Sequence, residues 1–568
     1  MDNTSETSEN TYVVYNANVY TVDYDNKQRA DAFVVRDGMF LDVGTKDEIM
    51  DKWKLVDKRI DAGGKTILPG IIDAHVVSIT TSREPNRSKA SEARSRIKAY
   101  ILSHKDNLNE SSWIRGFGWD QMHWESKEFP HWKDLSDLGT PFTCYMLLTR
   151  IDGHVIWTNE KVLKILSDMP ECIEGGEIVR DKETNEMTGI FVDNAMDFVV
   201  RKAPTLSETE KLTHVRSAIS HMHSVGLTGV HDASVPLDDI SFFKDVVARS
   251  PDDFNIRSYV MVESPQINEY CGDKVEMIIG YGEGRLTVRS VKLFMDGALG
   301  SWGAAMLEPY SDDPTKTGLL LSNPDNLPSV IQKWVSKGFQ VNTHCIGDRA
   351  NKIILDAYEK VFKTLALKCK PSADDVSDEI LEKETRRIGE KLRFRIEHAQ
   401  ILTLDDIQRA AKLGIIPSMQ PTHATSDMSY AEERIGKERI KGAYAWRSFL
   451  DAGVTAFPLS SDFPVEAANP FLGFYAAITR KWTDGNSPHG KQGWFPEQAL
   501  TREEALRGFT IDAAYAGFAE DMLGSISKGK YADFVVIDRD IMEIPEKDII
   551  DTRVIATVFG GSVVYGEL

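Results

Sequence analysis

The chain of 568 residues has few cysteines and neither a long apolar run nor an excess of basic residues. Its five cysteines are scattered and form no C-x-x-C pair, which excludes a disulfide scaffold and predicts a reducing compartment. No window approaches the roughly 18 uninterrupted apolar residues of a membrane-spanning helix. The opening MDNTSETSEN is polar and acidic and lacks the basic and apolar regions of a signal peptide. We therefore expect a cytosolic protein with no membrane partner.

The charge balance excludes another class of partner. The net charge is −20 and is spread along the chain rather than gathered in a tail, which argues against binding to nucleic acid. Apolar residues make up 42% and charged residues 27% of the chain, so a large core can be buried. We expect a small-molecule substrate as the partner and keep a homodimer as the candidate assembly.

Short β-like runs separated by turns occur at both ends of the chain. They cover residues 12–68, as in TYVVYNANVYTVD and DAFVVRDGMFLDVG, and residues 524–568, as in KYADFVVIDRD. Strand-rich ends that flank a long centre predict one small β-sandwich domain assembled from both termini. Residues 1–11 are predicted to be disordered.

The centre, residues 69–523, alternates strand-like runs with helical patterns, which predicts a parallel sheet. The strand candidates are TILPGIIDAH, GLTGVHDA, NIRSYVMV, VRSVKLFMDG, FQVNTHC, LRFRIEHAQ, GIIPSMQ and VTAFPLSSD. Helical patterns such as PSVIQKWVSK, ANKIILDAYEKVF and LDDIQRAAKL lie between the later ones. Eight such units predict an α/β fold, a (β/α)8 TIM-like barrel.

The first two strand candidates are unusually far apart. The first ends near residue 75 and the second begins near residue 226, and a structureless loop of that length would be implausible. We therefore expect an inserted subdomain at about residues 80–225, which contains the aromatic-rich stretches WIRGFGWDQMHW and TRIDGHVIWTN. A later charged stretch, LKCKPSADDVSDEILEKETRRIGEK, is predicted as a solvated helix or a mobile loop without a role.

In a barrel of this kind the active site lies at the carboxyl ends of the strands. The polar residues at those ends are His75, Lys292, Asp296, His344, His398 and Asp462. A single histidine there is more often structural than functional. Three histidines and an aspartate at the ends of separate strands converge on one axis, however, and their imidazole and carboxylate groups suit Zn²⁺, Mn²⁺ or Fe²⁺.

One ligand that this pattern calls for is missing. Alternation along the first strand aims position 77 to the same side as His75, but that position is Val77, which cannot coordinate a metal. The only literal His-x-His pairs His221 with His223, in the helical pattern LTHVRSAISHMHSVG. Residues two apart on a helix point about 200° apart, so we do not expect a metal site there.

Several motifs together resemble one family. VKLFMDGALGSWGAAMLEPY, THCIGDRANKIILDAYEKV, FRIEHAQ, PSMQPTHATSD, LSSDFPVEAANPF and KGKYADFVVID are similar, in this order, to the YtcJ-like branch of the amidohydrolase superfamily, which includes N-substituted formamide deformylases. The resemblance covers nearly the whole chain. It implies a metal-dependent (β/α)8 barrel joined to a small β-sandwich that both termini build, in agreement with the patterns above.

The resemblance also implies roles for five residues. His75 matches the first histidine of the family's strand-one His-x-His. Lys292 matches a lysine that is usually carboxylated and bridges two metals. His344 and His398 match the histidines that hold the more buried metal, and Asp462 matches an aspartate that binds metal and shuttles a proton.

Val77 stands where the family has the second histidine of that motif. The outer metal position would keep only His75, Asp462 and the shared carbamate, whereas the buried position stays complete. We therefore expect one divalent ion rather than two, most favourably Zn²⁺, with Mn²⁺ or Fe²⁺ as alternatives. The implied reaction is hydrolysis of a C–N bond by metal-activated water. Asp462 would act as the general base, and His75 would donate a hydrogen bond to the developing oxyanion.

The substrate pocket is predicted from polar and aromatic residues near the strand ends. The candidates are Trp119, His154, Asp296, Trp302, Gln420, His423 and Asp427. A packed aromatic or a capped loop residue is about as good an interpretation of these candidates. The aromatic residues favour an apolar or aromatic N-substituent on an amide, formamide or cyclic amide.

Two other classes of function stay open. An altered ligand set and a drier pocket at Val76 and Val77 would also suit a repurposed metalloenzyme that catalyses decarboxylation, cyclisation or isomerisation. Alternatively, the chain is a catalytically dead binding protein or a ligand-knockout variant. Long-term decay is disfavoured by the intact set of His344, His398, Lys292 and Asp462.

Overall fold

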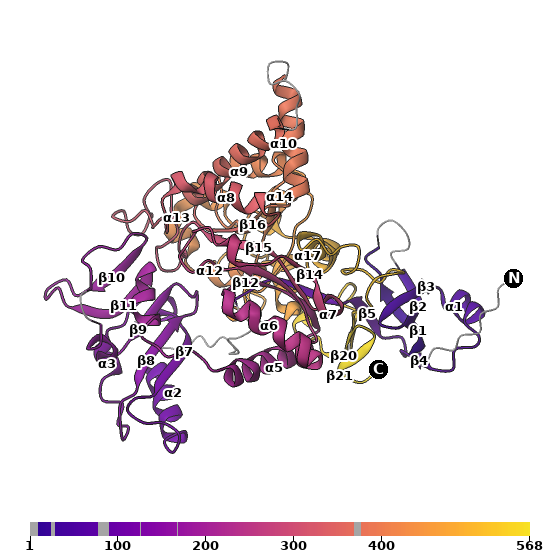
Figure 1. The fold of residues 1–568 in the computed structure, drawn as a ribbon, viewed down its shortest axis with the longest axis horizontal. Helices are drawn as coiled ribbons and strands as arrows, with labels where there is room; N and C mark the ends of the chain where they lie inside the picture. The colour runs from indigo at the N-terminus through magenta and orange to yellow at the C-terminus, as the bar shows by residue number, and fades with distance from the viewer. Residues whose placement is uncertain (1–9, 24–28, 78–89, 125, 167–168, 369–376) are drawn as a thin grey trace.

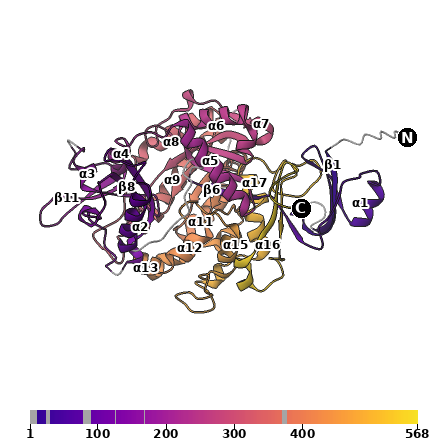
Figure 2. The same cartoon turned by 90° about the horizontal axis from the view of Figure 1, so that it is seen from below.

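The computed structural model describes residues 10–23, 29–77, 90–124, 126–166, 169–368 and 377–568. The central body is the barrel (Figure 1). The sheet of the inserted subdomain lies at one end of the molecule and the sheet formed by both termini lies at the other, as the second view also shows (Figure 2). The segment predicted as disordered lies almost entirely outside the described residues, and the first strand begins at Thr11.

Within the described residues, seven parallel strands form the barrel sheet, which confirms the predicted α/β barrel fold. Their order is β18-β17-β16-β15-β13-β12-β6. Their bounds are β6 Ile71–Val76, β12 Leu227–Val235, β13 Arg257–Val262, β15 Leu286–Phe294, β16 Gln340–Cys345, β17 Arg395–His398 and β18 Ile416–Ser418. A short strand, β14 Ile278–Gly280, pairs antiparallel with β15.

The eighth predicted strand, residues 454–462, is not a regular strand, yet it closes the barrel. Leu459 of this segment forms an isolated parallel bridge with Met419, and Phe463, directly after the segment, forms one with Val76. Pro458 has no N–H to donate, and Asp462 adopts a left-handed φ of 60°. These two residues prevent a continuous ladder in this segment.

The first predicted strand is in fact two strands that belong to different sheets. β5, Thr66–Pro69, joins the terminal sheet, and β6 joins the barrel. Between them, the N–H of Gly70 donates to the carbonyl of Asp533 at 2.8 Å. A Cβ at Gly70 would lie 2.2 Å from Thr228 Oγ1, so the close approach of the terminal sheet to the barrel requires glycine here.

Strands from both ends of the chain form the terminal sheet, as predicted. Its order is β21-β20-β19-β5-β1-β2-β3, and β4 pairs with β1. The remaining bounds are β1 Thr11–Tyr20, β2 Arg29–Arg36, β3 Met39–Gly44, β4 Arg59–Asp61, β19 Phe534–Ile537, β20 Val554–Phe559 and β21 Ser562–Gly566, with helix α1 Lys46–Lys52. Phe33 packs edge-on against Phe40 and Phe534, with ring centroids 5.4 and 5.1 Å away.

The inserted subdomain has a five-stranded sheet of its own, in the order β10-β11-β9-β8-β7. Its elements are α2 Ala90–Ser103, β7 Trp113–Trp119, β8 Tyr145–Arg150, β9 Val155–Thr158, α3 Glu160–Leu163, β10 Gly176–Arg180, β11 Met187–Asp193 and α4 Asp197–Val200. Neighbours along a strand face opposite sides, so Trp157 packs with Trp119 on one face and Ile156 packs with Phe191 on the other. The subdomain therefore has core residues on both faces of its sheet.

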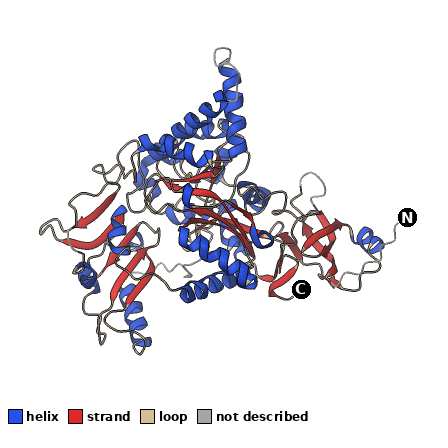
Figure 3. Ribbon diagram, viewed as in Figure 1, coloured by secondary structure: helices blue, strands red, loops and turns tan. Residues whose placement is uncertain are grey.

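Helices flank the barrel strands (Figure 3). The main ones are α5 Glu208–Ser224, α6 Leu237–Arg249, α8 Leu327–Ser336, α9 Asp348–Lys368, α10 Asp378–Leu392, α11 Leu404–Lys412, α14 Trp446–Asp451, α15 Pro470–Thr479, α16 Arg502–Gly508 and α17 Ile511–Ala516. The helical patterns named from the sequence correspond to α8, α9 and α11. No helix among the described residues is long and apolar enough to cross a membrane.

The pair His221 and His223 lies on α5, as its helical pattern predicts. His223 is buried, and its Nε2 lies 3.0 Å from the carbonyl of Asn255, which is a structural contact. α5 packs against β12 of the barrel and against β20 and β21 of the terminal sheet. This helix therefore covers the barrel, although it lies within the range expected for the insertion.

A buried ion pair joins the terminal sheet to the barrel. Arg257, at the start of β13, donates from Nε and Nη2 to the two carboxylate oxygens of Asp533 at 2.8 and 2.9 Å. Both side chains are at most 5% exposed. The Arg257 guanidinium also lies 4.0 Å from the centroid of the Tyr531 ring. The terminal sheet and the barrel are thus joined by a buried, bidentate ion pair.

Arg257→Met is expected to lower the free energy of unfolding by about 3–5 kcal/mol, because Asp533 would be left as an unpaired buried charge. Urea unfolding followed by circular dichroism measures the loss, and adding Asp533→Leu should restore part of it. Arg216→Met is the matched control, since Arg216 pairs with Asp253 at the surface and its side chain is 55% exposed. Equal losses in the two single variants would contradict the assignment.

Candidate metal centre

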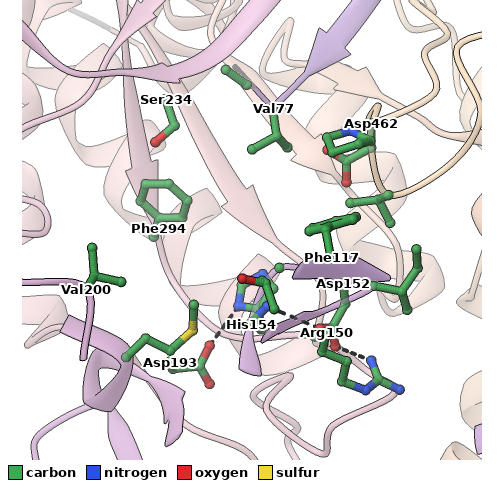
Figure 4. A pocket seen from close by; sticks show the side chains of 18 of the residues that line it. Val77, Phe117, Arg150, Asp152, His154, Asp193, Val200, Ser234, Phe294 and Asp462 are labelled. Atoms are coloured by element: carbon green, nitrogen blue, oxygen red, sulfur yellow. Dashed lines mark hydrogen bonds and ion pairs between the residues drawn. The ribbon is translucent and has the colours of Figure 1, made fainter. Parts of the chain in front are cut away.

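A cavity of about 1410 Å³ lies where the carboxyl ends of the barrel strands meet the inserted subdomain. His75, Lys292 and His398 contribute to its barrel wall. Phe117 and His154 contribute to its subdomain wall (Figure 4). This is the end of the barrel at which the sequence predicts the active site. The cavity is large enough for a small-molecule substrate.

Three donor groups converge in this cavity. One ligand atom each of His75, His398 and Asp462 lies within 4.8 Å of the others, and all three side chains are buried. His398 and Asp462 have left-handed φ values of 70° and 60°. Such backbone conformations are costly for residues other than glycine and cluster at functional sites.

The orientation of His75 is set by a buried carboxylate. His75 Nδ1 lies 2.5 Å from Glu397 Oε2, so its Nε2 faces the other way, toward the centre. There Nε2 lies 3.1 Å from Lys292 Nζ and 3.5 Å from Asp462 Oδ1. Burial lowers the pKa of His75 to about 4, which keeps the imidazole neutral. A neutral imidazole with one nitrogen occupied is the usual state of a metal-binding histidine.

Sequence reasoning missed Glu397 and the arginine that holds it. Arg395 Nη2 donates to Glu397 Oε2 at 2.9 Å and to the carbonyl of Ala74 at 2.7 Å. Its Nη1 lies 2.7 Å from His231 Nδ1. Arg395 is the cation that holds the pKa of Glu397 far below its usual range despite burial. The available signal was the pair of opposite charges inside the buried strand FRIEH, since buried charges need partners.

His344 and His398 lie side by side, with ring centroids 4.6 Å apart. His398 Nδ1 lies 2.9 Å from Gln420 Oε1. His344 Nε2 is buried without a hydrogen-bond partner among the described residues, and Asp296 Oδ1 is 3.6 Å away. Burial holds the pKa of both imidazoles well below the usual value.

Lys292 and Asp462 are both shifted toward their neutral forms. Burial lowers the pKa of Lys292 to about 8, although the charges of Glu397 and Asp462 oppose the shift. Burial raises the pKa of Asp462 to about 8, against the opposing charge of Lys292. The lysine amine is therefore more readily neutral than a solvent-exposed one, and the carboxylate is a stronger base.

These donors fit a divalent metal. Imidazole and carboxylate form a ligand set that suits Zn²⁺, Mn²⁺ or Fe²⁺. His344 Nε2 and Asp462 Oδ1 are buried and have no hydrogen bond among the described residues. Buried polar atoms usually have a partner, so a bound ion would explain both of these atoms. The grouping differs from the expected one, because His75 and Asp462 converge with His398, whereas the family resemblance assigns His398 to a separate ion.

Val77 follows β6 and lines the cavity (Figure 4), as His75 also does. The residue is 37% exposed. Its backbone N–H donates to the carbonyl of Phe463 at 2.7 Å, so the closing segment holds the backbone of this position. An apolar side chain therefore lines the cavity at the position where the resemblance predicts a ligand.

Three of the predicted substrate-binding residues line the cavity, namely His154, His423 and Asp427. His423 faces the donor groups, since its Nε2 lies 3.5 Å from Asp462 Oδ2. Asp427 accepts a hydrogen bond from the Tyr444 hydroxyl at 2.6 Å. Only His154 comes from the inserted subdomain.

The other four do not line the cavity, and each makes a structural contact. Trp119 packs in the subdomain core and donates to the carbonyl of Leu148 at 2.8 Å. Trp302 stacks under the Arg434 guanidinium, 3.4 Å from the ring centroid. Asp296 is fully buried and accepts backbone N–H groups from Ala305, Ile346 and Gly347. Gln420 contacts His398, as described above.

The inserted subdomain contributes polar groups that the sequence did not single out. Asp193, at the end of β11, lies with Oδ1 2.7 Å from His154 Nδ1. Burial would lower the pKa of His154, but the hydrogen bond and charge of Asp193 raise it to about 8. Arg150 donates to Asp152 and, at 2.6 Å, to Asp120. The signal for Asp193 was an acidic residue directly after the apolar strand GIFV.

Known proteins match the chain over most of its length. It is 30% identical to the protein LONG AFTER FAR-RED 3 of Arabidopsis thaliana, over 97% of this chain and 91% of that protein. It is 28% identical to the putative amidohydrolase YtcJ of Bacillus subtilis (strain 168), over 96% and 98% of the two chains. It is 26% identical to an N-substituted formamide deformylase of Arthrobacter pascens, over 97% and 98%.

A solved structure agrees with these relatives. An uncharacterized metal-dependent hydrolase from Pyrococcus horikoshii OT3 superimposes with a TM-score of 0.72 at 25% identity, over 94% of this chain and 99% of that one. Residues 58–565 match the model of the amidohydrolase family. Because this match runs from the terminal sheet through the barrel to the last strand, it confirms the resemblance seen in the motifs, and the chain belongs to the amidohydrolase family.

Proposed function

We propose that the chain is a metal-dependent hydrolase that cleaves a C–N bond in a small amide, formamide or cyclic amide. The observation that carries the proposal is the convergence of His75, His398 and Asp462 at one end of a cavity of about 1410 Å³. Three protein ligands with room for a further one are typical of catalytic metal sites. The cytosolic location, the small-molecule partner and the homodimer remain predictions.

His75, His398 and Asp462 would hold the ion, with His344 and Lys292 beside them. A divalent metal, most favourably Zn²⁺, supplies Lewis-acid polarisation of a carbonyl and a lowered pKa of water. Lys292 can add a further anionic ligand if its neutral amine is carboxylated. The lowered pKa of Lys292 favours this reaction, because the neutral amine is the form that attacks carbon dioxide.

Asp462 is the proposed proton shuttle. Its carboxylate accepts a proton from water as the water oxygen attacks the carbonyl carbon. It then returns the proton to the nitrogen as the C–N bond breaks, so that a carboxylic acid and an amine leave. Burial raises the pKa of Asp462, which makes its carboxylate a stronger base than a solvated one.

The apolar part of the cavity supports a substrate with an apolar or aromatic group. Phe117, Phe294, Leu299 and Val465 line it together with Val77. Side chains of this kind bury an aryl or alkyl substituent, whereas the polar donors bind the amide. The name of the formamide deformylase relative supports formamides as the first substrates to test.

The first test is the metal content of protein purified without chelator. We expect about one ion per chain, because His75, His398 and Asp462 converge on one position and Val77 supplies no ligand for a second ion. His398→Ala should lose most of this metal, whereas His221→Ala, at the His-x-His on α5, should keep it. Elemental analysis measures both. A wild-type chain without metal, or one with two fully occupied ions, would contradict the proposal.

Asp462→Asn should reduce turnover by at least about 10²-fold, because the amide keeps the shape of the side chain but cannot accept the proton. Release of amine from a panel of N-formyl and N-acyl amines measures the rate. The fold, followed by circular dichroism, and the metal content should stay close to those of the wild type. A variant that keeps more than about a tenth of the rate would exclude Asp462 as the base.

Val77→His should supply a ligand for a second ion, since residue 77 lines the cavity together with His75. Metal content should rise toward two ions per chain, and hydrolysis of N-formyl amines should increase. Elemental analysis and the amine-release assay, run on the same preparation, check both. A variant that gains metal but loses its native activity would instead support a non-hydrolytic reaction that depends on a dry cavity.

A further inference from the structure

One histidine of the inserted subdomain reaches the donor groups of the barrel. His154 precedes β9, and its ring centroid lies 5.1 Å from that of His344. In Figure 4 it lies in the cavity, with a contact to Asp193. The two parts of the chain that meet here are far apart in sequence, so only the docked subdomain brings this imidazole to the cavity.

His154 is held by both its backbone and its side chain. Its backbone N–H donates to Asp152 Oδ1 at 3.1 Å, and its carbonyl accepts from the N–H of Asp193 at 2.9 Å. Its Nδ1 lies 2.7 Å from Asp193 Oδ1. The ring therefore has one defined orientation, which is what a pre-organised substrate contact requires.

Asp193 is itself fixed by the barrel. Its carboxylate is fully buried, and its backbone has a left-handed φ of 49°. A Cβ on Gly297 would lie 2.5 Å from Asp193 Oδ2, and one on Gly303 would lie 3.0 Å from it. These glycines of the DGALGSWG loop leave the space that the carboxylate occupies. Strain of this kind persists where the surrounding structure imposes it, most often at functional sites.

The second nitrogen of His154 remains available. Because Asp193 occupies Nδ1, Nε2 is the polar atom left on the opposite edge of the ring, and it has no hydrogen-bond partner among the described residues. The side chain is 18% exposed and lines the cavity. If His154 and Asp193 served only to dock the subdomain, they would not need an accessible nitrogen beside the candidate metal ligands.

We propose that Nε2 of His154 hydrogen-bonds the scissile amide of the substrate and that Asp193 is its positioning residue. The inserted subdomain then supplies a group that contacts the reacting end of the substrate, in addition to closing the cavity. This inference rests on the proposed function, because it takes an amide as the bound group. Hydrogen bonds from pre-oriented groups at the reacting carbonyl are among the larger contributions to such catalysis.

The test uses the metal-loaded full chain and 4-nitroformanilide, whose hydrolysis releases coloured 4-nitroaniline. The main variant combines His154→Phe with Asp193→Asn, which keeps a ring in place and leaves no unpaired carboxylate. We expect kcat/KM to fall by about 10²–10³-fold, the usual effect of losing one such hydrogen bond. His154→Gln should stay within about tenfold of the wild type, since its amide can reach the position of Nε2. The kcat/KM of Asp193→Asn alone should lie between the values of the double variant and of His154→Gln.

Metal content and the thermal unfolding midpoint separate this role from a structural one. Both should be unchanged in His154→Gln. The activity of this variant then distinguishes a hydrogen-bonding role from a structural one, even if the double variant is unstable. A double variant within about threefold of the wild type would overturn the proposal. A His154→Gln variant that folds and binds metal, yet is as inactive as the double variant, would overturn hydrogen bonding as the role.

The same probe separates this inference from the proposed function. If the metal-loaded wild type does not hydrolyse 4-nitroformanilide, the proposed reaction fails for this substrate, and binding can be measured by calorimetry without turnover. Binding about tenfold weaker in the double variant than in the wild type would support the His154 contact. Equal binding by the two proteins, or no binding by the wild type, would overturn it.

Discussion

The hydrogen bond from the Asp462 N–H to the His75 carbonyl, at 2.9 Å, closes the barrel at the point where no regular strand is present. The same backbone contact places the Asp462 carboxylate beside the His75 imidazole, 3.5 Å away. Asp73 stabilises this contact between β6 and the closing segment, since its Oδ1 accepts from the backbone N–H groups of His75 and Ser461 at 3.2 and 3.0 Å. Barrel closure and the arrangement of the candidate ligands therefore depend on the same backbone contact.

The interior of the barrel contains more charge than a core that serves stability alone would have. Arg395 pairs with Glu397, and Glu397 in turn orients His75. Removing such groups from water is costly, and replacing a buried ion pair by apolar residues is often neutral or stabilising. The cost is understandable if the pair fixes which nitrogen of His75 faces the centre, because that orientation determines where an ion can be held.

The inserted subdomain and the barrel share one cavity, and each constrains the other. Asp193 of the subdomain occupies the space that Gly297 leaves in the loop after β15. The amide of Asn194, the next residue, donates to the carbonyl of Leu321 at 3.0 Å. The loop after β15 is thus packed against the subdomain as well as the barrel. The subdomain is therefore part of the wall that a substrate meets, and its sequence contributes to which substituents fit.

The local patterns of the sequence determined the barrel and the set of candidate ligands. Alternating strand and helix periods, with caps such as Thr403 before α11, report local conformation and require no knowledge of distant contacts. The carboxyl ends of parallel strands must converge, so His75, His398 and Asp462 could be expected near one another before any side chain was placed. The replacement at Val77 was visible for the same reason, since position 77 follows from strand alternation.

Tertiary packing decided the rest. It divided one apolar run at Gly70 between two sheets and placed Trp119 in the core of the subdomain rather than at the cavity. It also grouped His398 with the outer ligands, because the rotation of each side chain depends on its neighbours. Glu397 beside His75 and Asp193 beside His154 follow no spacing rule, since each pair joins segments that meet only in the folded chain. Such contacts arise from how whole elements dock, which local sequence patterns do not encode.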